Sequence, residues 1–300
     1  MIKIQEELCK LFQGNLKKYI EKYITNNKLQ EIRIKINEPC ILTADNREFI
    51  INHIVSREEM KFIIQKISNY SLYAYEEEIK QGFITIKGGH RVGLAGECVM
   101  EKNIVKTIRN ISSINIRICR EIIGCSDKIY KYIYDGDRIY NTLIVSPPKC
   151  GKTTILRDIA RSISENKKRV TVIDERSEIA ACFMGVPQMK LGIRCDVLDN
   201  CLKSEGMIMA IRSLSPEVII CDEIGRREDV LSLEAAFNSG INVISTIHGF
   251  NLEDIKRRRV FNNLILENIL ERIIILSARK GPATLESIYK VSGKEVVKIV

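Results

Sequence analysis

A short segment near the middle of the chain combines the residue types that bind a nucleoside triphosphate. Residues 146–153 read S-P-P-K-C-G-K-T, which follows the Walker A pattern G-x-x-x-x-G-K-[ST] except at the first position, where Ser146 replaces glycine. In such a phosphate loop, backbone N–H groups surround the phosphates, the lysine reaches the β- and γ-phosphates, and the next hydroxyl ligates Mg²⁺. The segment therefore predicts a site for ATP and Mg²⁺, with Lys152 and Thr153 in these two roles.

Two prolines limit which part of this loop can donate hydrogen bonds to phosphate. Pro147 and Pro148 have no N–H, so we expect the donors to come from Cys150 through Thr154. The missing glycine lies outside that group, and its loss is expected to affect backbone freedom and turnover rate rather than binding. A proline-rich turn with a chance Gly-Lys-Thr is the alternative. The predicted nucleotide-binding residues are Ser146, Pro147, Pro148, Lys149, Cys150, Gly151, Lys152, Thr153 and Thr154.

A second segment supplies the acidic groups that such a loop requires. Residues 216–223 read PEVIICDE, an apolar run that ends in Asp222 and Glu223. The run predicts a buried strand whose carboxyl end lies at the edge of the sheet where α/β proteins bind ligands. We interpret it as a Walker B strand, in which Asp222 holds the Mg²⁺ shell and Glu223 polarises the attacking water. An Asp-Glu pair on the surface is common in isolation, but much less so downstream of a phosphate loop.

Two further strand-like runs end in polar residues. NVISTIH, residues 242–248, ends in His248, for which we favour a role in sensing the γ-phosphate over a purely structural one. VTVID, residues 170–174, ends in Asp174 and is followed by Glu175 and Arg176. Water positioning, subunit contact and a solvated cluster of salt bridges all remain open for this acidic group.

A parallel sheet is needed to bring these strand ends together. After about Gly124, apolar β-rich runs alternate with helix-length segments, a pattern that predicts βαβ units and a sheet buried on both faces. The fold class is therefore α/β, with a C-terminal P-loop NTPase core of the RecA/AAA+ type over residues 125–300. A turn at Gly281-Pro282 and an edge strand are expected to close it. The apolar runs are 142–146, 169–174, 218–223, 242–248 and 272–278.

The first third of the chain predicts a smaller α+β domain over residues 1–124. Ser56 followed by Glu59 is a capping-box signature at the start of a helix. Gly88-Gly89 joins two strand-like runs as a hairpin turn would. The expected helices cover 3–24 and 56–81, and the expected strands lie within 29–42, 82–99 and 112–122.

Composition limits the class of protein. The chain has 300 residues, 45% of them hydrophobic and 28% charged, which is the balance of a globular protein. Its apolar runs are too short for a membrane span, and its N-terminus does not resemble a secretory signal. The ten cysteines form no C-x-x-C pair, so buried free thiols in a reducing compartment are expected. We expect a cytoplasmic protein with no integral membrane segment, for which peripheral attachment through partners stays open.

The order of the motifs resembles that of the secretion-superfamily ATPases, the hexameric motors of type II and type IV secretion and of pilus assembly. In residues 210–249, Ile211-Arg212 precedes the acidic strand, Glu223 ends it, and Thr246-Ile247-His248 follows one helix later. VIDERSE falls where that family has its acidic box. Asp222 departs from the pattern, because the secretion motors usually have glycine at that position.

A closer resemblance is to the sporulation ATPases of endospore-forming bacteria, and it spans most of the chain. The segments IRIKINEPCIL, GGHRVGLAGE, SSINIRICREI, PPKCGKTT, IDERSEIA, GIRCDVLD and RSLSPEVIICDEIG occur here in the order of that family. The resemblance implies a homo-oligomeric, hexameric Mg²⁺-dependent ATPase in the mother cell. It also implies service to a secretion-like channel toward the forespore and docking on membrane protein partners. Because the basic residues are mostly dispersed along the chain, we expect no obligatory nucleic acid.

The resemblance further implies that arginines of the N-terminal domain reach the nucleotide. The matching positions are Arg91 and Arg117, with Arg120 as a weaker candidate. A guanidinium group can neutralise charge that develops on the transferred phosphoryl group. The alternative is that these arginines face solvent on their strands. Arg212 is a candidate for coupling between subunits.

Two other functions remain open. The net charge of +9 and the predicted fold also suit a nucleic-acid-dependent ATPase of recombinase or helicase type. Against it, the chain has no tryptophan and no clear aromatic stacking platform. The other alternative is a nucleotide-gated scaffold that hydrolyses little ATP.

Overall fold

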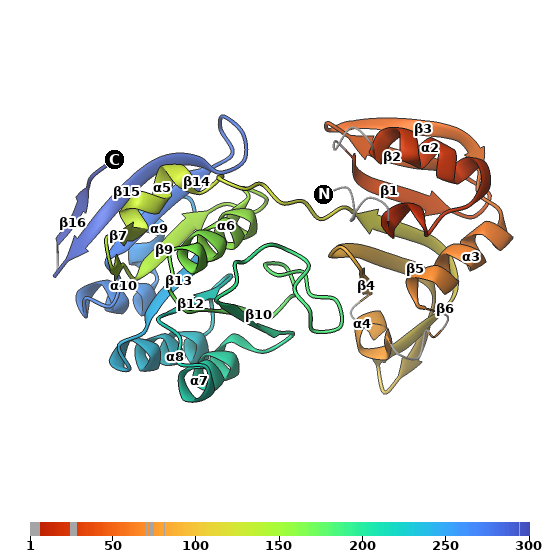
Figure 1. Cartoon of the computed structure of the whole chain (residues 1–300). Coiled ribbons are helices and arrows are strands. Elements are labelled where there is room, and N and C mark those ends of the chain that lie inside the picture. Colours follow the sequence, from red (N-terminus) through yellow and green to blue (C-terminus); the bar gives the residue numbers. More distant parts are fainter. Residues whose placement is uncertain (1–6, 25–28, 70, 72–74, 81, 294) are drawn as a thin grey trace. The chain divides into compact units, whose positions relative to one another are not determined.

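The chain divides into two compact units. The computed structural model describes residues 7–24, 29–69, 71, 75–80, 82–293 and 295–300. The N-terminal unit consists of Met1–Arg120 together with Ala181–Gln188, and the C-terminal unit consists of Glu121–Ala180 together with Met189–Val300 (Figure 1). Residues 181–188 thus leave the second unit and return to it. That residues 1–124 and 125–300 fold as independent domains stays a prediction.

The N-terminal unit is built on an antiparallel sheet. Its described strands are β1 (Leu29–Lys35), β2 (Pro39–Ala44), β3 (Arg47–Ile54), β4 (Phe83–Ile86), β5 (His90–Glu101) and β6 (Ile104–Arg117), and its helices are α2 (Gly14–Ile24), α3 (Arg57–Ile67) and α4 (Glu76–Lys80). The strands follow the order β3-β2-β1-β6-β5-β4. Side chains of α2 and α3, such as Ile20 and Ile63, are buried in one cluster with Ile32 and Ile114 of the sheet.

Local sequence signals in this unit are confirmed, while two predicted helices are shorter than expected. At the start of α3, Glu59 N–H donates to Ser56 Oγ at 3.1 Å and Ser56 N–H donates to the Glu59 carboxylate at 2.9 Å, which is the predicted capping box. The predicted Gly88-Gly89 turn joins β4 to β5. The helix predicted over 56–81 ends at Ile67, near Asn69 with its φ of +46°, and α4 is a separate helix. The helix predicted over 3–24 is interrupted at residues 10–13, so that α2 begins at Gly14, and residues 3–6 lie outside the described residues.

The C-terminal unit is an α/β sheet, as predicted. Its strands are β9 (Thr142–Ser146), β10 (Val170–Asp174), β11 (Cys195–Asp199), β12 (Val218–Cys221), β13 (Asn242–His248), β14 (Arg272–Ser277), β15 (Thr284–Ser292) and β16 (Glu295–Lys298). They follow the order β11-β10-β12-β13-β9-β14-β15-β16. The pairs from β11 to β14 are parallel, and β15 and β16 add antiparallel strands. A small hairpin pairs β7 (Tyr134–Asp135) with β8 (Arg138–Ile139).

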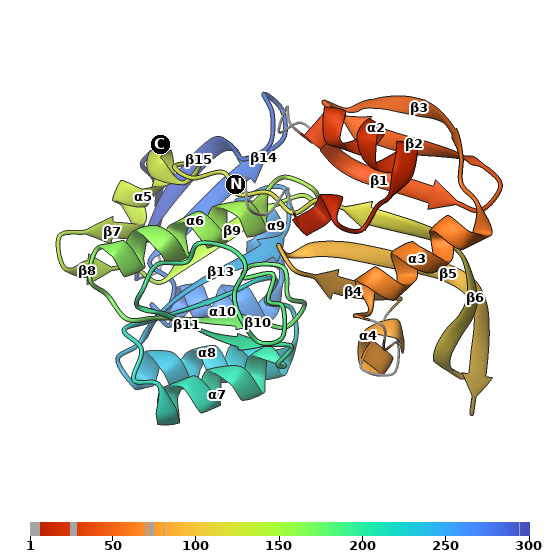
Figure 2. The ribbon, with the colours of Figure 1, turned by 45° about the vertical axis from the view of Figure 1, so that its right-hand side comes forward.

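Helices cover both faces of this sheet, which explains its apolar strands. The helices are α5 (Asp127–Ile133), α6 (Lys152–Glu165), α7 (Lys203–Ser213), α8 (Arg227–Asn238), α9 (Leu252–Arg257) and α10 (Arg259–Leu266). Helices α7 to α10 share one buried cluster with alternate strand residues such as Leu143 and Val145. Helix α6 contacts β10, β12 and β13 (Figure 2). Every residue of β9, β10 and β12 is buried.

Two features of the sheet differ from expectation. Strand β11 is absent from the prediction, because two of the five residues in its sequence, CDVLD, are aspartates and it is only partly buried as an edge strand of the sheet. The strand after Gly281-Pro282, β15, is not the edge strand, because β16 pairs with it on the outside. No helix in the described ranges is long and apolar enough to span a membrane.

The sheet brings the predicted site residues to one edge. Strands β9, β10, β12 and β13 are parallel neighbours, so their carboxyl ends meet on the same side. Ser146 ends β9 and is paired in register with His248, which ends β13. Asp174 ends β10, and Asp222 directly follows β12. This edge is therefore the place to look for a nucleotide site.

Candidate nucleotide-binding site

The predicted phosphate loop connects β9 to α6, in the strand–loop–helix order that phosphate binding requires. Gly151 caps the helix with a φ of +82°, a conformation that favours glycine. The loop after β14 packs against it, since Ala283 N–H donates to the Cys150 carbonyl at 2.8 Å. A Cβ added at Gly151 would lie 3.6 Å from the Cβ of Pro282. The second glycine of the motif is thus required by its backbone angle.

Ser146, the residue in place of the first glycine, is a strand residue in this structure. It is fully buried and belongs to the ladder that pairs β9 with β13. Its hydroxyl donates to the Pro147 carbonyl at 3.1 Å. The conformation at this position therefore does not require glycine.

Lys152 lies at the start of α6 with its ammonium group directed back into the loop. Its Nζ donates to the carbonyls of Ser146 and Pro147 at 3.4 and 3.2 Å and to His248 Nδ1 at 3.0 Å. Burial lowers the pKa of Lys152, and the carboxylates of Asp222 and Glu223 oppose that shift. The two loop carbonyls and His248 thus accept hydrogen bonds from the buried ammonium group of Lys152. The Walker A motif predicts that this group contacts phosphate.

Glu223 and His248, the predicted water-activating and sensing residues, are in direct contact. His248 Nε2 lies 3.0 Å from Glu223 Oε1, and Arg176 Nη1 lies 3.2 Å from Glu223 Oε2. An ammonium group can only donate, so Lys152 requires Nδ1 of His248 to be the acceptor, and Nε2 of a neutral ring then carries the proton. Lys152, His248, Glu223 and Arg176 therefore form one continuous chain of polar contacts.

Asp222 joins the acidic strand to the phosphate loop. Thr153 Oγ1 donates to Asp222 Oδ2 at 2.8 Å, and Thr246 Oγ1 donates to the other carboxylate oxygen. The hydroxyl and the carboxylate are hard oxygen ligands of the type Mg²⁺ prefers, and Mg²⁺ in nucleotide sites takes only one or two protein groups besides water and phosphate. Because the Thr153 proton is directed at Asp222, its lone pairs stay available to a metal ion. The predicted Thr153 and Asp222 pair thus fits Mg²⁺.

The acidic residues at the end of β10 are engaged in contacts within the protein. Asp174 is buried, and its carboxylate accepts N–H groups of Glu178 and Ala180, each at 2.8 Å. Burial raises the pKa of Asp174, against the effect of these hydrogen bonds. Glu175 forms an ion pair with Lys203 that is mostly shielded from solvent. The idea of a solvated salt-bridge cluster is therefore wrong for Asp174, which fastens the turn that follows its strand.

The predicted arginines are not among the residues that this edge of the sheet brings together. Arg91 lies over the ring of Phe83, 4.6 Å from its centroid, and Arg117 is exposed at the end of β6. Arg120 donates to the Leu29 carbonyl at 2.6 Å. All three belong to the N-terminal unit, so their role at the nucleotide stays a prediction. So does the role of Arg212, which is exposed in the last turn of α7.

Two residues of the site were missed by sequence reasoning. The sequence pattern identifies Thr246 only as part of a Thr-x-His box, whereas in the structure its hydroxyl contacts the end of the acidic strand. A signal was available, because residues two apart on a strand point to the same face, which places Thr246 beside His248. The sequence places Arg176 only beside Asp174 and Glu175, and its contact with Glu223 depends on the order of the strands in the sheet.

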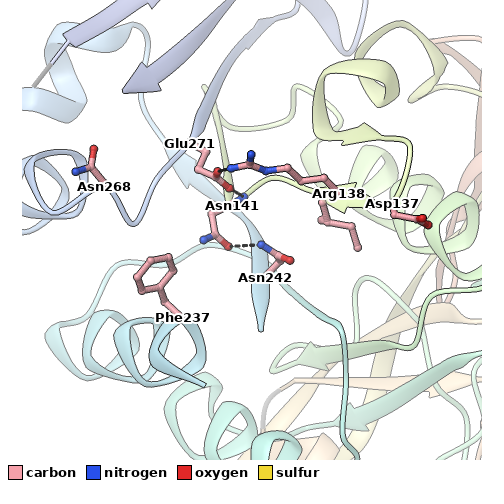
Figure 3. Close-up of a pocket in the computed structure, with 8 residues that line it drawn as sticks. Asp137, Arg138, Asn141, Phe237, Asn242, Asn268 and Glu271 are labelled. Atoms are coloured by element: carbon pink, nitrogen blue, oxygen red, sulfur yellow. Dashed lines mark hydrogen bonds and ion pairs between the residues drawn. The ribbon is translucent and has the colours of Figure 1, made fainter. Parts of the chain in front are cut away.

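A hollow lies on the other side of the sheet, at the amino ends of its parallel strands (Figure 3). Its volume is about 650 Å³, and its lining includes Arg138, Asn141, Asn242 and Glu271. These groups satisfy one another: Glu271 accepts from Arg138 and from Asn141 N–H, and Asn242 donates to Asn141 Oδ1 (Figure 3). The hollow shares no residue with the phosphate loop, and its polar groups fasten the amino ends of the strands.

Comparison with known proteins identifies the family. The profile of the family described as "Sporulation stage III, protein AA" matches residues 2–296. The chain belongs to this family. It is 44% identical over 271 residues to stage III sporulation protein AA of Bacillus subtilis, covering 89% of this chain and 88% of that protein. The resemblance to the sporulation ATPases of endospore-forming bacteria is thereby confirmed.

Solved structures support the fold. The ATPase DotB of Yersinia pseudotuberculosis matches with a TM-score of 0.63 at 15% identity, covering 94% of this chain and 80% of that one. The pilus retraction motor PilT, solved with bound ADP, matches with a TM-score of 0.59 at 16% identity, covering 86% and 76%. Similarity at this level of identity concerns the fold, and it confirms the predicted P-loop NTPase core with an additional N-terminal part.

Proposed function

We propose that this chain is a Mg²⁺-dependent ATPase that works as a subunit of a ring-shaped motor. The observation that carries the proposal is the continuous polar chain Lys152–His248–Glu223, which lies beside the Thr153–Asp222 pair. A phosphate-binding cation, a metal-binding hydroxyl and a carboxylate able to activate water are the three groups that ATP hydrolysis needs in one place.

The chemistry assigned to each residue follows from its contacts. Lys152 and the N–H groups at the start of α6 bind the β- and γ-phosphates of ATP. Mg²⁺, when bound, neutralises charge on the phosphate oxygens. Glu223 accepts a proton from the attacking water, whose oxygen bonds to the γ-phosphorus as the bond to the bridging oxygen breaks, leaving ADP and phosphate. His248 touches both Lys152 and Glu223, so it is the group that relates phosphate occupancy to the catalytic carboxylate.

The biological setting is proposed from family membership. The Bacillus subtilis relative is named for sporulation, and the structural neighbours are described as an ATPase and as a pilus retraction motor. These similarities support a cytoplasmic ring, hexameric as in the secretion motors, that energises a secretion-like channel from mother cell to forespore through membrane protein partners. In that ring Arg91 and Arg117 approach the nucleotide, and Arg212 contributes to subunit coupling.

Steady-state ATPase assays of the wild type, Lys152→Ala and Glu223→Gln test this function, with sizing in the presence of a non-hydrolysable ATP analogue. We expect hydrolysis to be lost in both variants, binding to be lost only in Lys152→Ala, and larger oligomers to form with the analogue. Lys298→Ala and Glu295→Gln, at exposed positions of β16, are matched controls that should hydrolyse normally. A wild type that is monomeric and inert at every concentration contradicts the proposal. Strong, salt-sensitive stimulation by single-stranded DNA would favour a recombinase-type ATPase instead.

A further inference from the structure

Thr246 is bound to the tip of the acidic strand through both its side chain and its backbone. The parallel ladder between β12 and β13 ends at the pair Cys221 and Ser245. Beyond it, Thr246 Oγ1 accepts the N–H of Glu223 at 2.8 Å, and the Thr246 carbonyl accepts the N–H of Ile224 at 2.9 Å. The same hydroxyl donates its proton to the carboxylate of Asp222. One fully buried residue thus engages three consecutive residues of the strand tip.

The backbone at Glu223 needs this support. Glu223 has a φ of +53°, a left-handed conformation that is unfavourable for a residue with a side chain. Such conformations persist where surrounding contacts over-determine them. The two hydrogen bonds from Thr246 hold the peptides on either side of Glu223, and the Glu223 side chain then meets His248. The threonine therefore fixes where the catalytic carboxylate is presented.

The orientation of Asp222 depends on the same hydroxyl. One Asp222 oxygen receives the proton of Thr246, and the other receives the proton of Thr153 at 2.8 Å. With both oxygens engaged, the carboxylate cannot rotate without breaking a hydrogen bond to a charged acceptor, which is among the stronger kinds. Thr246 hence holds Asp222 in the orientation that in turn directs the Thr153 hydroxyl.

We propose that Thr246 is a positioning residue that sets both the Mg²⁺-binding pair and the water-activating residue of this ATPase. The inference rests on the proposed function and deepens it. The Thr246 hydroxyl donates to the side chain of Asp222 and accepts the N–H of Glu223. One group therefore positions both the proposed Mg²⁺ ligand and the residue proposed to activate water. Its removal therefore affects Mg²⁺-dependent nucleotide binding as well as hydrolysis, whereas a threonine that merely fills the core would affect folding stability alone.

The experiment compares Thr246→Val, which keeps the shape and removes the hydroxyl, with Thr246→Ser, which keeps the hydroxyl. Thr142→Val is the matched control, because Thr142 is equally buried at the opposite end of neighbouring β9 and its hydroxyl donates only to the Tyr140 carbonyl among the bonds described. Binding of a fluorescent ADP is titrated against Mg²⁺, and ATP turnover is measured at saturating Mg²⁺. Thermal unfolding without metal or nucleotide reports folding separately.

We expect Thr246→Val to raise the Mg²⁺ concentration for half-maximal ADP binding on the order of tenfold and to lower turnover by at least as much. Thr246→Ser should stay within about threefold of the wild type, since it keeps the hydrogen bonds. Combining Thr246→Val with Asp222→Asn should add little to the Mg²⁺ effect of Asp222→Asn alone, because coupled residues are not additive. If Thr246→Val proves unstable, Thr246→Ala, which also lacks the hydroxyl, replaces it in the same measurements.

Three results would overturn the inference. The first is a wild-type Mg²⁺ requirement in Thr246→Val, and the second is equal damage in Thr246→Ser and Thr246→Val. The third is additivity of Thr246→Val with Asp222→Asn. Each leaves the proposed function intact if the wild type hydrolyses ATP and Lys152→Ala does not. A wild type that binds no nucleotide removes the proposed function and this inference together.

Discussion

Asp158 is a buried polar residue whose loss should strongly weaken the C-terminal unit. Its buried carboxylate accepts the N–H and the hydroxyl of Ser126 at 2.9 and 2.7 Å and the N–H of Gly124 at 3.1 Å. Arg161 donates to it through two nitrogens, at 3.0 and 2.7 Å. These bonds fasten the segment that enters the C-terminal unit to α6, the helix that carries the phosphate loop at its amino end. The perturbation is Asp158→Ala.

The expected loss of stability follows from these partners. Removing one member of a buried, hydrogen-bonded ion pair costs about 3–5 kcal/mol, because the remaining groups stay buried without a partner. Ser126 is fully buried and cannot turn to solvent. We expect Asp158→Ala to lose about 3–5 kcal/mol, and Asp158→Asn, which keeps one acceptor oxygen, about 1.5–3 kcal/mol. At about 2–4 °C per kcal/mol, the melting temperature of Asp158→Ala should fall by roughly 6–20 °C.

Urea unfolding of the wild type, Asp158→Ala and Asp158→Asn measures this effect. Glu165→Ala is the matched control, because Glu165 pairs with the same Arg161 from a side chain that is 55% exposed, and such pairs contribute about 0–1 kcal/mol. A loss below about 1 kcal/mol in Asp158→Ala, or an equal loss in the control, would refute the reasoning.

The pH dependence supplies an independent check on Asp158. Burial raises the pKa of this carboxyl, but the hydrogen bonds from Ser126, Arg161 and Gly124 outweigh burial and lower the pKa overall. A lowered pKa in the folded state stabilises the fold above the ordinary carboxyl pKa of about 3.9, and that contribution disappears as the pH falls through the folded value. The stability difference between wild type and Asp158→Asn should therefore be constant near neutral pH and shrink below about pH 4.

Three further predictions concern the phosphate loop. Gly151→Ala places a Cβ at a φ of +82° and should weaken the binding of fluorescent ADP at least about tenfold. Gly136→Ala, at a φ of +60° with no atom within 4 Å, should lower folding stability by a similar amount and leave ADP binding unchanged. Equal ADP binding by both variants would contradict this prediction. Lys152→Met should abolish ADP binding without lowering the melting temperature. The reason is that burial of the ammonium group, which lowers its pKa, is unfavourable for folding. A clearly lower melting temperature would mean that the hydrogen bonds to the loop carbonyls outweigh this unfavourable burial. Ser146→Gly should lower the free energy of unfolding in urea by about 0.5–1 kcal/mol and should not raise the rate of ATP turnover, because Ser146 is a buried strand residue. Faster hydrolysis would show that the conformation at the start of the loop limits the rate.

The fully buried strands of the C-terminal unit could be predicted, because burial on both faces leaves a mostly apolar run in the sequence. Strands such as β9 and β12 are buried at every position and contain the apolar runs LIV and VII. Parallel packing then places Ser146, Asp222 and His248 at the same ends of their strands, so these three members of the site could be predicted from local sequence, whereas Thr246 and Arg176 were not. The turn at Gly88-Gly89 and the capping box at Ser56 are also local, and both were predicted.

The contacts between those members could not be predicted in the same way, because they depend on strand order. Strand β10 precedes β12 by more than forty residues in the chain, yet the two are neighbours in the sheet. Only that pairing brings Arg176 to Glu223. The return of residues 181–188 to the N-terminal unit rests on long-range contacts such as the Gly88 N–H to Gln188 Oε1 bond at 2.9 Å. No periodicity within either segment encodes such a pairing.

The order of the strands also explains the order of the contacts in the polar chain from Lys152 to Arg176. Going across the sheet, β9, β13, β12 and β10 follow one another, and the contacts Lys152–His248, His248–Glu223 and Glu223–Arg176 run in the same direction. Each contact spans one strand interval, so no side chain has to reach beyond its neighbour. Arg176 begins the segment that leaves for the N-terminal unit at residue 181. A series of contacts that starts at Lys152 therefore ends at Arg176, in the segment that leads to residue 181; for the proposed motor, these contacts are a route by which hydrolysis would act outside the nucleotide site.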